Sequence, residues 1–395
     1  MLRRLLVTIL ALAAIAVVAG FAVVPGIVDR RMNRVVDAPH VVIGDSARAL
    51  HATLRVADMH ADQLLWGRDP LARASHGHVD LPRLRDGNVA LQVFSVVTKT
   101  PREMNYDRNT GETDNILLLA IVQRWPVATW RSLRARAIHQ AARLQDAVAR
   151  SSGALVLITD QESFDAFILR HTLKSDVHAA VLAIEGLHAL DGRIESVDTL
   201  FAHGYRMMGL THFFDNEVAG SAHGVSHGGL TPLGREVITR MEALGIIVDL
   251  AHASPQAVTE VLAMATRPVV VSHTGVAATC PGPRNLTDEQ LRAIAANGGL
   301  VGIGYWDAAV CTLGARSIAA AIRHAVDVAG IDHVGLGSDF DGATATPFAT
   351  DRLGEITQAL LDENFTKGQV AQVMGENVLR LIRAGLPVTA PDAVR

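Results

Sequence analysis

The chain has 395 residues, of which 49% are hydrophobic and 19% charged, and its formal net charge is −4. This composition is typical of a globular protein and excludes an intrinsically disordered chain. Its basic residues form no stripe, so we expect no nucleic-acid partner.

The first predicted element is a membrane-spanning helix at the N-terminus. Arg3 and Arg4 precede an uncharged run from Leu5 to Val28, which is about the length that a helix needs to cross a bilayer. A signal peptide has a shorter apolar region and a small-residue cleavage site, which this run matches poorly. We therefore favour an uncleaved signal anchor over a cleaved signal peptide for residues 1–34. Basic residues flank the run on both sides, so its orientation stays open.

Residues 35–395 are expected to form one (β/α)₈ barrel of the TIM type. Eight short runs rich in Val, Ile and Leu lack the alternation of half-exposed strands, as is typical of strands buried on both faces of a parallel sheet. Eight such runs separated by helical segments favour a closed barrel. Residues 108–178 are too long for one helix and are expected to be a helical insertion. The runs are Leu54–His60, Ala90–Val97, Ala180–Glu185, Arg206–His212, Gly245–His252, Pro268–His273, Gly299–Tyr305 and His333–Asp339.

Capping residues mark the starts of three intervening helices. Thr231 precedes a helix that Gly245 is expected to end. Ser254 precedes a proline, which suits the first helical position. Thr287 is followed three residues later by Gln290, the pattern of a capping box.

Six of the eight predicted strands end in a histidine or a carboxylate. The C-terminal ends of barrel strands meet on one rim, where barrel active sites lie. Imidazole and carboxylate are the ligands of hydrolytic zinc sites, and this set exceeds what one tetrahedral ion needs. Taken singly, each residue has a structural explanation, but their succession at strand ends predicts a hydrolase with two ions bridged by a carboxylate and a hydroxide. The residues are His60, Asp62, Glu185, His212, His252, His273 and Asp339.

Several long segments carry a family resemblance. The chain resembles the membrane dipeptidase (renal dipeptidase) family of zinc metallopeptidases, in its bacterial branch, from about residue 55 to about residue 382. The resemblance implies a (β/α)₈ barrel with two Zn²⁺ per chain that hydrolyses the peptide bond of dipeptides, with a D residue at the C-terminal position as one option. A homodimer is one oligomeric state that it implies. The matching segments include DMHADQLLW, AIEGLHAL, MGLTHFFDNEVAGSAHG, GIIVDLAHAS, PVVVSHTG, RNLTDEQL and VGLGSDFDG.

The resemblance also assigns metal ligands. His60 and Asp62 would bind the first zinc, and Glu185 would bridge both ions. His252 and His273 would bind the second zinc.

Three further residues receive roles from the resemblance. Asp339 would lie beside the first zinc, as a weak ligand or as the carboxylate that handles the proton. His212 would stabilise the oxyanion of the tetrahedral intermediate. Arg284 would bind the C-terminal carboxylate of the substrate.

The two cysteines bear on localisation. From the residues alone, Cys280 and Cys311 are either one disulfide or two buried thiols. The resemblance implies a disulfide, which suits an exported domain. We therefore expect a catalytic domain on the outer side of a bacterial inner membrane, anchored there or released after signal cleavage.

Two rival functions stay open at this point. One is another amidohydrolase-type barrel hydrolase, such as a lactonase, a deaminase or a β-lactam or amide hydrolase. Many of those carry a bridging carboxylated lysine, whereas Glu185 ends the third predicted strand here. The other is a non-catalytic, membrane-tethered binding protein, in which a metal ligand would be lost. None of the six expected metal-site positions is lost.

The remaining polar and aromatic residues near the strand ends receive no metal role. His223 and His227 lie in a glycine-rich loop and are expected to be exposed. Asp341 is expected to bind backbone within its own turn, or to support the site from behind. Trp66 and Tyr305 either contact substrate or pack in the core.

Overall fold

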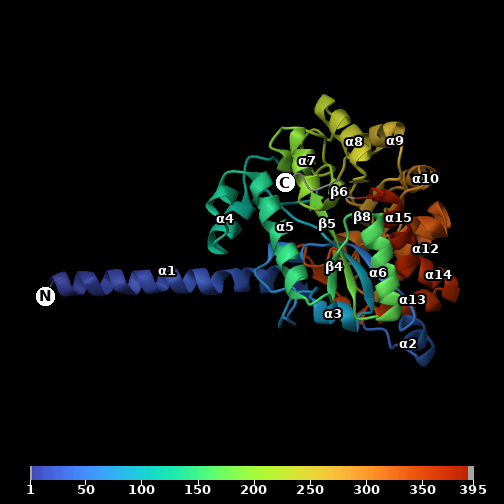
Figure 1. Ribbon diagram of the computed structural model, residues 1–395, viewed down its shortest axis with the longest axis horizontal. Helices are drawn as coiled ribbons and strands as arrows, with labels where there is room; N and C mark the ends of the chain where they lie inside the picture. Colours follow the sequence, from blue (N-terminus) through green and yellow to red (C-terminus); the bar gives the residue numbers. More distant parts are fainter. Residues whose placement is uncertain (1, 390–395) are drawn as a thin grey trace.

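Eight parallel strands close into a barrel in the computed structural model, which describes residues 2–389 (Figure 1). Each of these strands pairs with the next along the chain, and β10 pairs with β2 through Leu336 and Asp58. Every residue in the eight strands is buried, as their unbroken apolar runs predict. The strands are β2 (Val56–Ala61), β3 (Val89–Phe94), β5 (His178–Glu185), β6 (Tyr205–Gly209), β7 (Ile247–Asp249), β8 (Val270–Thr274), β9 (Leu300–Ile303) and β10 (Val334–Leu336).

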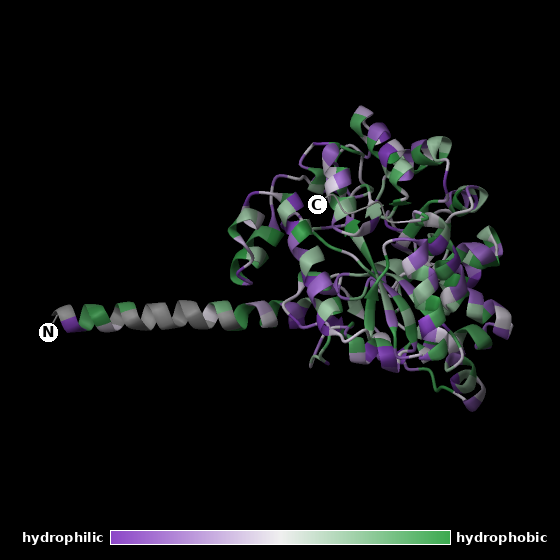
Figure 2. Cartoon of the chain, viewed as in Figure 1, coloured by the Kyte–Doolittle hydropathy of each residue, from purple (hydrophilic) through white to green (hydrophobic). Residues whose placement is uncertain are grey.

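Helices surround the barrel and bury their apolar faces against it. Figure 2 shows hydrophobic strands at the centre and helices of mixed hydropathy around them. The (β/α)₈ fold predicted from the sequence is therefore confirmed. The helices are α2 (Asp45–His51), α3 (Leu81–Asp86), α7 (Glu195–Ala202), α8 (Pro232–Leu244), α9 (Pro255–Met264), α10 (Asp288–Ala296), α11 (Asp307–Val310), α12 (Ala315–Ala329), α13 (Gly354–Asp362), α14 (Lys367–Ala371) and α15 (Asn377–Gly385).

The chain between β3 and β5 includes the interval expected to be an insertion. It contains α4 (Asn115–Val122), α5 (Leu133–Arg150), β4 (Leu155–Leu157) and α6 (Gln161–Leu173). Strand β4 pairs with the first residues of β5 and lengthens the sheet there without entering the ring. The barrel thus closes through the pairing of β3 with β5.

The predicted caps fix the helix starts. The side chain of Thr231 accepts a hydrogen bond from the N–H of Gly234, and that of Ser254 accepts one from Ala257. Thr287 forms the expected capping box with Gln290. Each bond satisfies a backbone donor that the first helical turn leaves free.

The N-terminal segment forms one long helix, α1 (Leu2–Met32), which extends away from the barrel (Figure 1). Among the residues that the structure describes, no helix reaches the length and hydropathy of a membrane span. The anchor expected over residues 5–28 falls partly outside this description, because the side chains of residues 9, 11–19 and 22 are not described.

The barrel end of α1 is joined to the barrel by buried polar contacts. Asp29 is 2% exposed, and its Oδ2 accepts a hydrogen bond of 2.8 Å from Nε of Arg68. Asn33 donates to the other oxygen of Asp29 and accepts from the N–H of Ala343. Beyond the helix, β1 (Arg34–Val35) pairs with β11 (Ala345–Thr346). The boundary between an anchor of residues 1–34 and a catalytic domain of residues 35–395 stays a prediction. The contacts of Asp29 and Asn33 join residues on the two sides of that boundary.

Candidate metal centre

Glu185, the last residue of β5, lies at the centre of a group of imidazoles. Its Oε1 is 2.8 Å from Nε2 of His252 and 3.2 Å from Nε2 of His273. Its Oε2 is 3.3 Å from Nε2 of His212 and 3.9 Å from Nε2 of His60. One carboxylate therefore faces ring nitrogens that come from four other strands or the loops after them.

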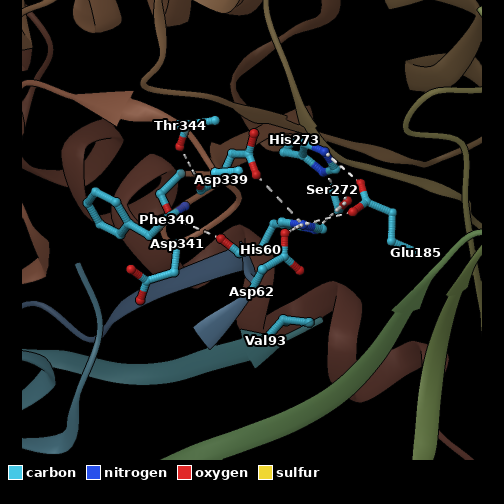
Figure 3. Close-up of polar contacts among 12 residues, drawn as sticks. His60, Asp62, Val93, Glu185, Ser272, His273, Asp339, Phe340, Asp341 and Thr344 are labelled. Carbon is cyan, nitrogen blue, oxygen red and sulfur yellow. Dashed lines mark hydrogen bonds and ion pairs between the residues drawn. The ribbon is translucent and has the colours of Figure 1, made fainter. Parts of the chain in front are cut away.

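A second group adjoins the first on the side of His60. The Nε2 atom of His60 is 3.5 Å from Oδ2 of Asp62 and 4.0 Å from Oδ1 of Asp339. Figure 3 shows His60, Asp62, Asp339, His273 and Glu185 with their polar atoms facing one another. The structure thus brings together all six side chains that the sequence nominated as metal ligands, and places His212 among them.

Five strands end earlier than the sequence predicted, three of them before a residue of the site. Strand β7 ends at Asp249 and β10 ends at Leu336, so His252 and Asp339 lie in the loops that follow. The backbone explains this difference, because both residues have positive φ, 61° and 57°, a left-handed conformation that a strand does not contain. The strand β6 likewise ends at Gly209, before His212.

A buried aspartate positions one loop of ligands. Asp249 accepts hydrogen bonds from the N–H groups of Ala251 and Ser272, at 3.0 and 2.9 Å. The hydroxyl of Ser272 donates to the same carboxylate at 2.5 Å, and lies 2.9 Å from Nδ1 of His273. If the hydroxyl accepts from Nδ1–H, the Nε2 of His273 is left as a lone-pair donor toward Glu185.

A second buried aspartate, Asp58, positions the segments that carry Asp62 and Asp339. It accepts hydrogen bonds of 3.0 Å from the N–H of His60, and from both the N–H and the hydroxyl of Ser338. It therefore connects the segment that carries Asp62 to the segment that carries Asp339. This role of Asp58 was not predicted from the sequence. The signal was its position two residues before His60, which puts both side chains on the same face of the strand.

Burial and charge act in opposite directions on the titration of this centre. Burial lowers the pKa values of His212, His252 and His273, which keeps these imidazoles neutral. Burial also lowers the pKa of His60, but the charges of nearby carboxylates outweigh it and raise that pKa to about 10. Burial raises the pKa of Asp339 to about 8. Without a cation, Glu185 and Asp339 therefore tend to take up protons, because burial raises the pKa of both carboxyl groups.

These side chains fit metal ions. Nε2 of His60, Oδ1 of Asp62 and Oε1 of Glu185 are buried and have no hydrogen-bond partner. Nε2 of His252 and Nε2 of His273 lie 3.0 Å apart, so at least one of these two nitrogens presents a lone pair. Three groups of ligand atoms, each within 4.8 Å of one another, are His60–Glu185–His273, Glu185–His212–His252 and His60–Asp62–Asp339. Divalent cations would satisfy the lone pairs and offset the carboxylate charge.

A cavity of about 540 Å³ reaches this centre. Arg284 lines it and is 5% exposed, with Nη2 bonded to the carbonyl of His273 at 2.6 Å. Its Nε has no hydrogen-bond partner. The guanidinium lies 5.4 Å from the ring of Trp306, which also lines the cavity. Trp306, an aromatic residue three positions after the end of β9, was not predicted from the sequence to be near the site.

Several smaller expectations need correction. His223 is fully buried and stacks on Phe213, because its loop folds back over the site, whereas His227 is exposed as expected. Asp341 binds backbone, but the N–H groups belong to His78 and Val79 in a distant loop.

The two aromatic residues near strand ends behave differently. Trp66 lines the cavity. Tyr305 is buried in the core against Phe340 and Phe348. Of the two alternatives, Trp66 is thus in a position to contact substrate, and Tyr305 packs in the core.

Cys280 and Cys311 form a disulfide with an S–S distance of 2.08 Å. The bridge joins the loop before Arg284 to the end of α11. It therefore restrains the segment that carries Arg284.

A comparison with known families finds one match over most of the chain. Residues 44–389 match the family model described as membrane dipeptidase (Peptidase family M19). The chain is similar to Dipeptidase aclJ of Aspergillus oryzae, at 28% identity over 362 residues that cover 83% of this chain and 77% of that protein. It is 30% identical to Dipeptidase verJ of Clonostachys rogersoniana over 315 residues, which cover 77% of this chain and 75% of that one.

Solved structures share the fold. The probable dipeptidase PvdM from Pseudomonas aeruginosa aligns with a TM-score of 0.72 at 19% identity, over 86% of this chain and 97% of that chain. A metallo peptidase from Rhodobacter sphaeroides, liganded with a phosphinate mimic of the dipeptide L-Ala-D-Ala, aligns with a TM-score of 0.68 at 22% identity, over 84% of this chain and 99% of that chain.

The contacts of Asp249 yield a test of the centre that removes no ligand. We expect Asp249→Asn and Ser272→Ala each to weaken metal binding about 10- to 100-fold, because outer partners hold the ring of His273 in its binding orientation. Metal affinity is measured by competition with a chelator. The control is Asp80→Asn, a buried aspartate that caps α3 away from the cavity, which should leave the affinity unchanged. Unaltered affinity in both test variants would contradict the positioning role.

Proposed function

Because the chain belongs to the membrane dipeptidase family and is a metal-dependent hydrolase of dipeptides, we propose that it works with two zinc ions at the rim of its barrel. Glu185 would bridge the ions, with His60 and Asp62 on one side and His252 and His273 on the other. The observation that carries this proposal is the Glu185 carboxylate, whose two oxygens face four imidazole nitrogens at 2.8–3.9 Å.

The bound ions would polarise the scissile carbonyl and bring the pKa of a water molecule toward neutrality. The protein's own groups then divide the remaining work. Oδ1 of Asp339 lies 4.0 Å from Nε2 of His60, so this carboxylate would stand beside the first ion, where it would take a proton from water and pass it to the leaving amine. His212, kept neutral by burial, would donate a hydrogen bond to the oxyanion.

Arg284 would set the length of the substrate. A guanidinium pairs bidentately with a carboxylate, and this one has an unused Nε–H at the cavity. With the C-terminal carboxylate held there, the scissile bond of a dipeptide lies one residue away, at the metal centre. The ligand of the Rhodobacter sphaeroides structure mimics L-Ala-D-Ala, which supports a D residue at the C-terminal position.

The rival functions have less support. A lactonase or deaminase of the amidohydrolase type commonly has a lysine at the bridging position, and Glu185 occupies it here. A non-catalytic binding protein would be expected to lack a ligand, yet all six are brought together at the rim.

We further propose that α1 anchors the enzyme in a bacterial inner membrane with the barrel on the outer side. The uncharged run from Leu5 to Val28 and the Cys280–Cys311 disulfide support this location. The homodimer implied by the resemblance stays a prediction, and the mass of the detergent-solubilised chain would decide it.

The metal assignment is tested with two histidine variants of the full chain. Wild type should contain about two zinc ions per chain and hydrolyse alanyl-alanine. We expect His252→Ala to lose both metal and activity, because it removes a ligand. His212→Ala should keep the metal but lose activity about 100-fold or more, as expected for a lost oxyanion donor.

Metal content by elemental analysis distinguishes these outcomes. Loss of metal in His212→Ala would make that residue a ligand instead. A wild type with two metals and no activity on any dipeptide would refute the proposed reaction.

The role of Arg284 is tested by removing the charge that it recognises. We expect Arg284→Met to lower kcat/KM for a dipeptide about 100-fold, since a bidentate charged pair contributes ~3 kcal/mol. The corresponding dipeptide amide, which lacks the carboxylate, should lose far less. Arg284→Lys keeps the charge and serves as the comparison. Equal losses on both substrates would contradict the carboxylate contact.

Membrane attachment is tested by fractionation. The full chain should stay in the membrane pellet after an alkaline wash, whereas a chain that begins at Val23 should be released. Release of the full chain would contradict the anchor.

A further inference from the structure

The cavity at the metal centre has a second, apolar half. Its charged lining residues, Asp62, Glu185, Arg284 and Asp339, all belong to the site described above. Aliphatic side chains of α1 and α4 also line the cavity. They are Val24, Val28, Met32, Ile116, Leu118, Leu119 and Val122.

Several of these side chains are open to solvent. Val24 is 42% exposed, Met32 is 43% exposed and Leu118 is 52% exposed. Large aliphatic side chains that remain exposed around a cavity mark a surface that gains free energy when an apolar group covers it. The lining of this half offers no charged partner, so a charged substrate side chain would lose its hydration there without compensation.

The α1 wall is fixed to the barrel. Helices α1 and α4 are in contact on the same side of the barrel (Figure 1). Asp29, which follows Val28 directly and precedes Met32 by three residues, is bonded to Arg68, whose guanidinium also lies 2.8 Å from Asp341. The side-chain oxygen of Asn33 accepts a hydrogen bond from the N–H of Ala343. The wall is therefore built on the same short segment that carries Asp339.

The contacts also give the cavity a direction. Arg284 lies 3.4 Å from His252, which adjoins Glu185. The side-chain contacts of Arg284 are with His252, His273 and Trp306, and none of these lies on α1 or α4. The α1 wall instead joins the loop that follows Asp339, through Asn33 and Ala343. A dipeptide held by its C-terminal carboxylate at Arg284 would point its amino-terminal residue toward the wall.

We propose that the barrel end of α1 forms, together with α4, an apolar subsite that selects dipeptides whose amino-terminal residue has a long aliphatic side chain. The inference rests on the proposed function, because that function sets the direction of the substrate. It makes the last turns of α1 a part of the substrate site, so the membrane-spanning part of this helix would end before Val24.

The test compares two faces of α1 in the full, metal-loaded chain. The variant Val24→Ser/Val28→Ser alters the cavity wall. The control Val23→Ser/Ile27→Ser makes an equivalent change on side chains that are 55% and 47% exposed and do not line the cavity. The substrates are leucyl-alanine and alanyl-alanine, each with L- and D-alanine. Wild type should prefer the leucyl substrates, and the wall variant should lose about tenfold in kcat/KM on them while changing less than twofold on the alanyl ones.

Calorimetry on metal-free protein gives a second readout, because apolar contacts do not need the ions. Leucyl-alanine should bind more tightly than alanyl-alanine, and only the wall variant should lose this difference. Equal losses on both substrates, an unchanged preference, or the same effect in the control would overturn the subsite. If wild type hydrolyses no dipeptide, the proposed function fails, and the binding preference alone then decides the subsite.

Discussion

The rim of the barrel depends on one constraint, the burial of ligand atoms that have no partner within the protein. Oε1 of Glu185 and Nε2 of His60 are buried and have no hydrogen-bond partner. Such an arrangement costs several kcal/mol unless a cation compensates it. The protein holds it because β5 and its neighbours are rigid and fully buried, and because Asp58 and Asp249 bind the backbone of the loops that present the ligands. The fold thus keeps the atoms in place before any ion arrives.

The sequence indicated the barrel, and it indicated which side chains gather at its rim, because both follow from local patterns. A strand buried on both faces is an unbroken apolar run, and the polar residue after it lies on the rim by geometry. The contacts that the sequence did not reveal join distant segments. Asp29 meets Arg68, and Asp341 binds the backbone of His78, only after the chain has folded. The burial of His223 likewise depends on how its loop closes over Phe213.

The division between anchor and enzyme is less sharp than the composition suggests. An apolar run followed by arginines is typical of a tether that ends before the domain begins. In this chain, helix α1 continues past that run into buried hydrogen bonds, and β1 then pairs with β11 in a separate two-stranded sheet. Because Arg68 contacts both Asp29 and Asp341, a substitution near residue 29 would disturb the loop that carries Asp339.

The left-handed backbone at His252 and Asp339 has a consequence for how the enzyme tolerates change. A non-glycine residue in that conformation costs ~1 kcal/mol or more, and glycine would relieve the cost at either position. Glycine has no side chain to bind a metal or carry a proton. Selection for thermal resistance alone would therefore favour substitutions that abolish activity at these two positions. At the rim, substitutions that raise thermal stability would lower catalytic activity. In the barrel beneath it, stability can be optimised without this conflict.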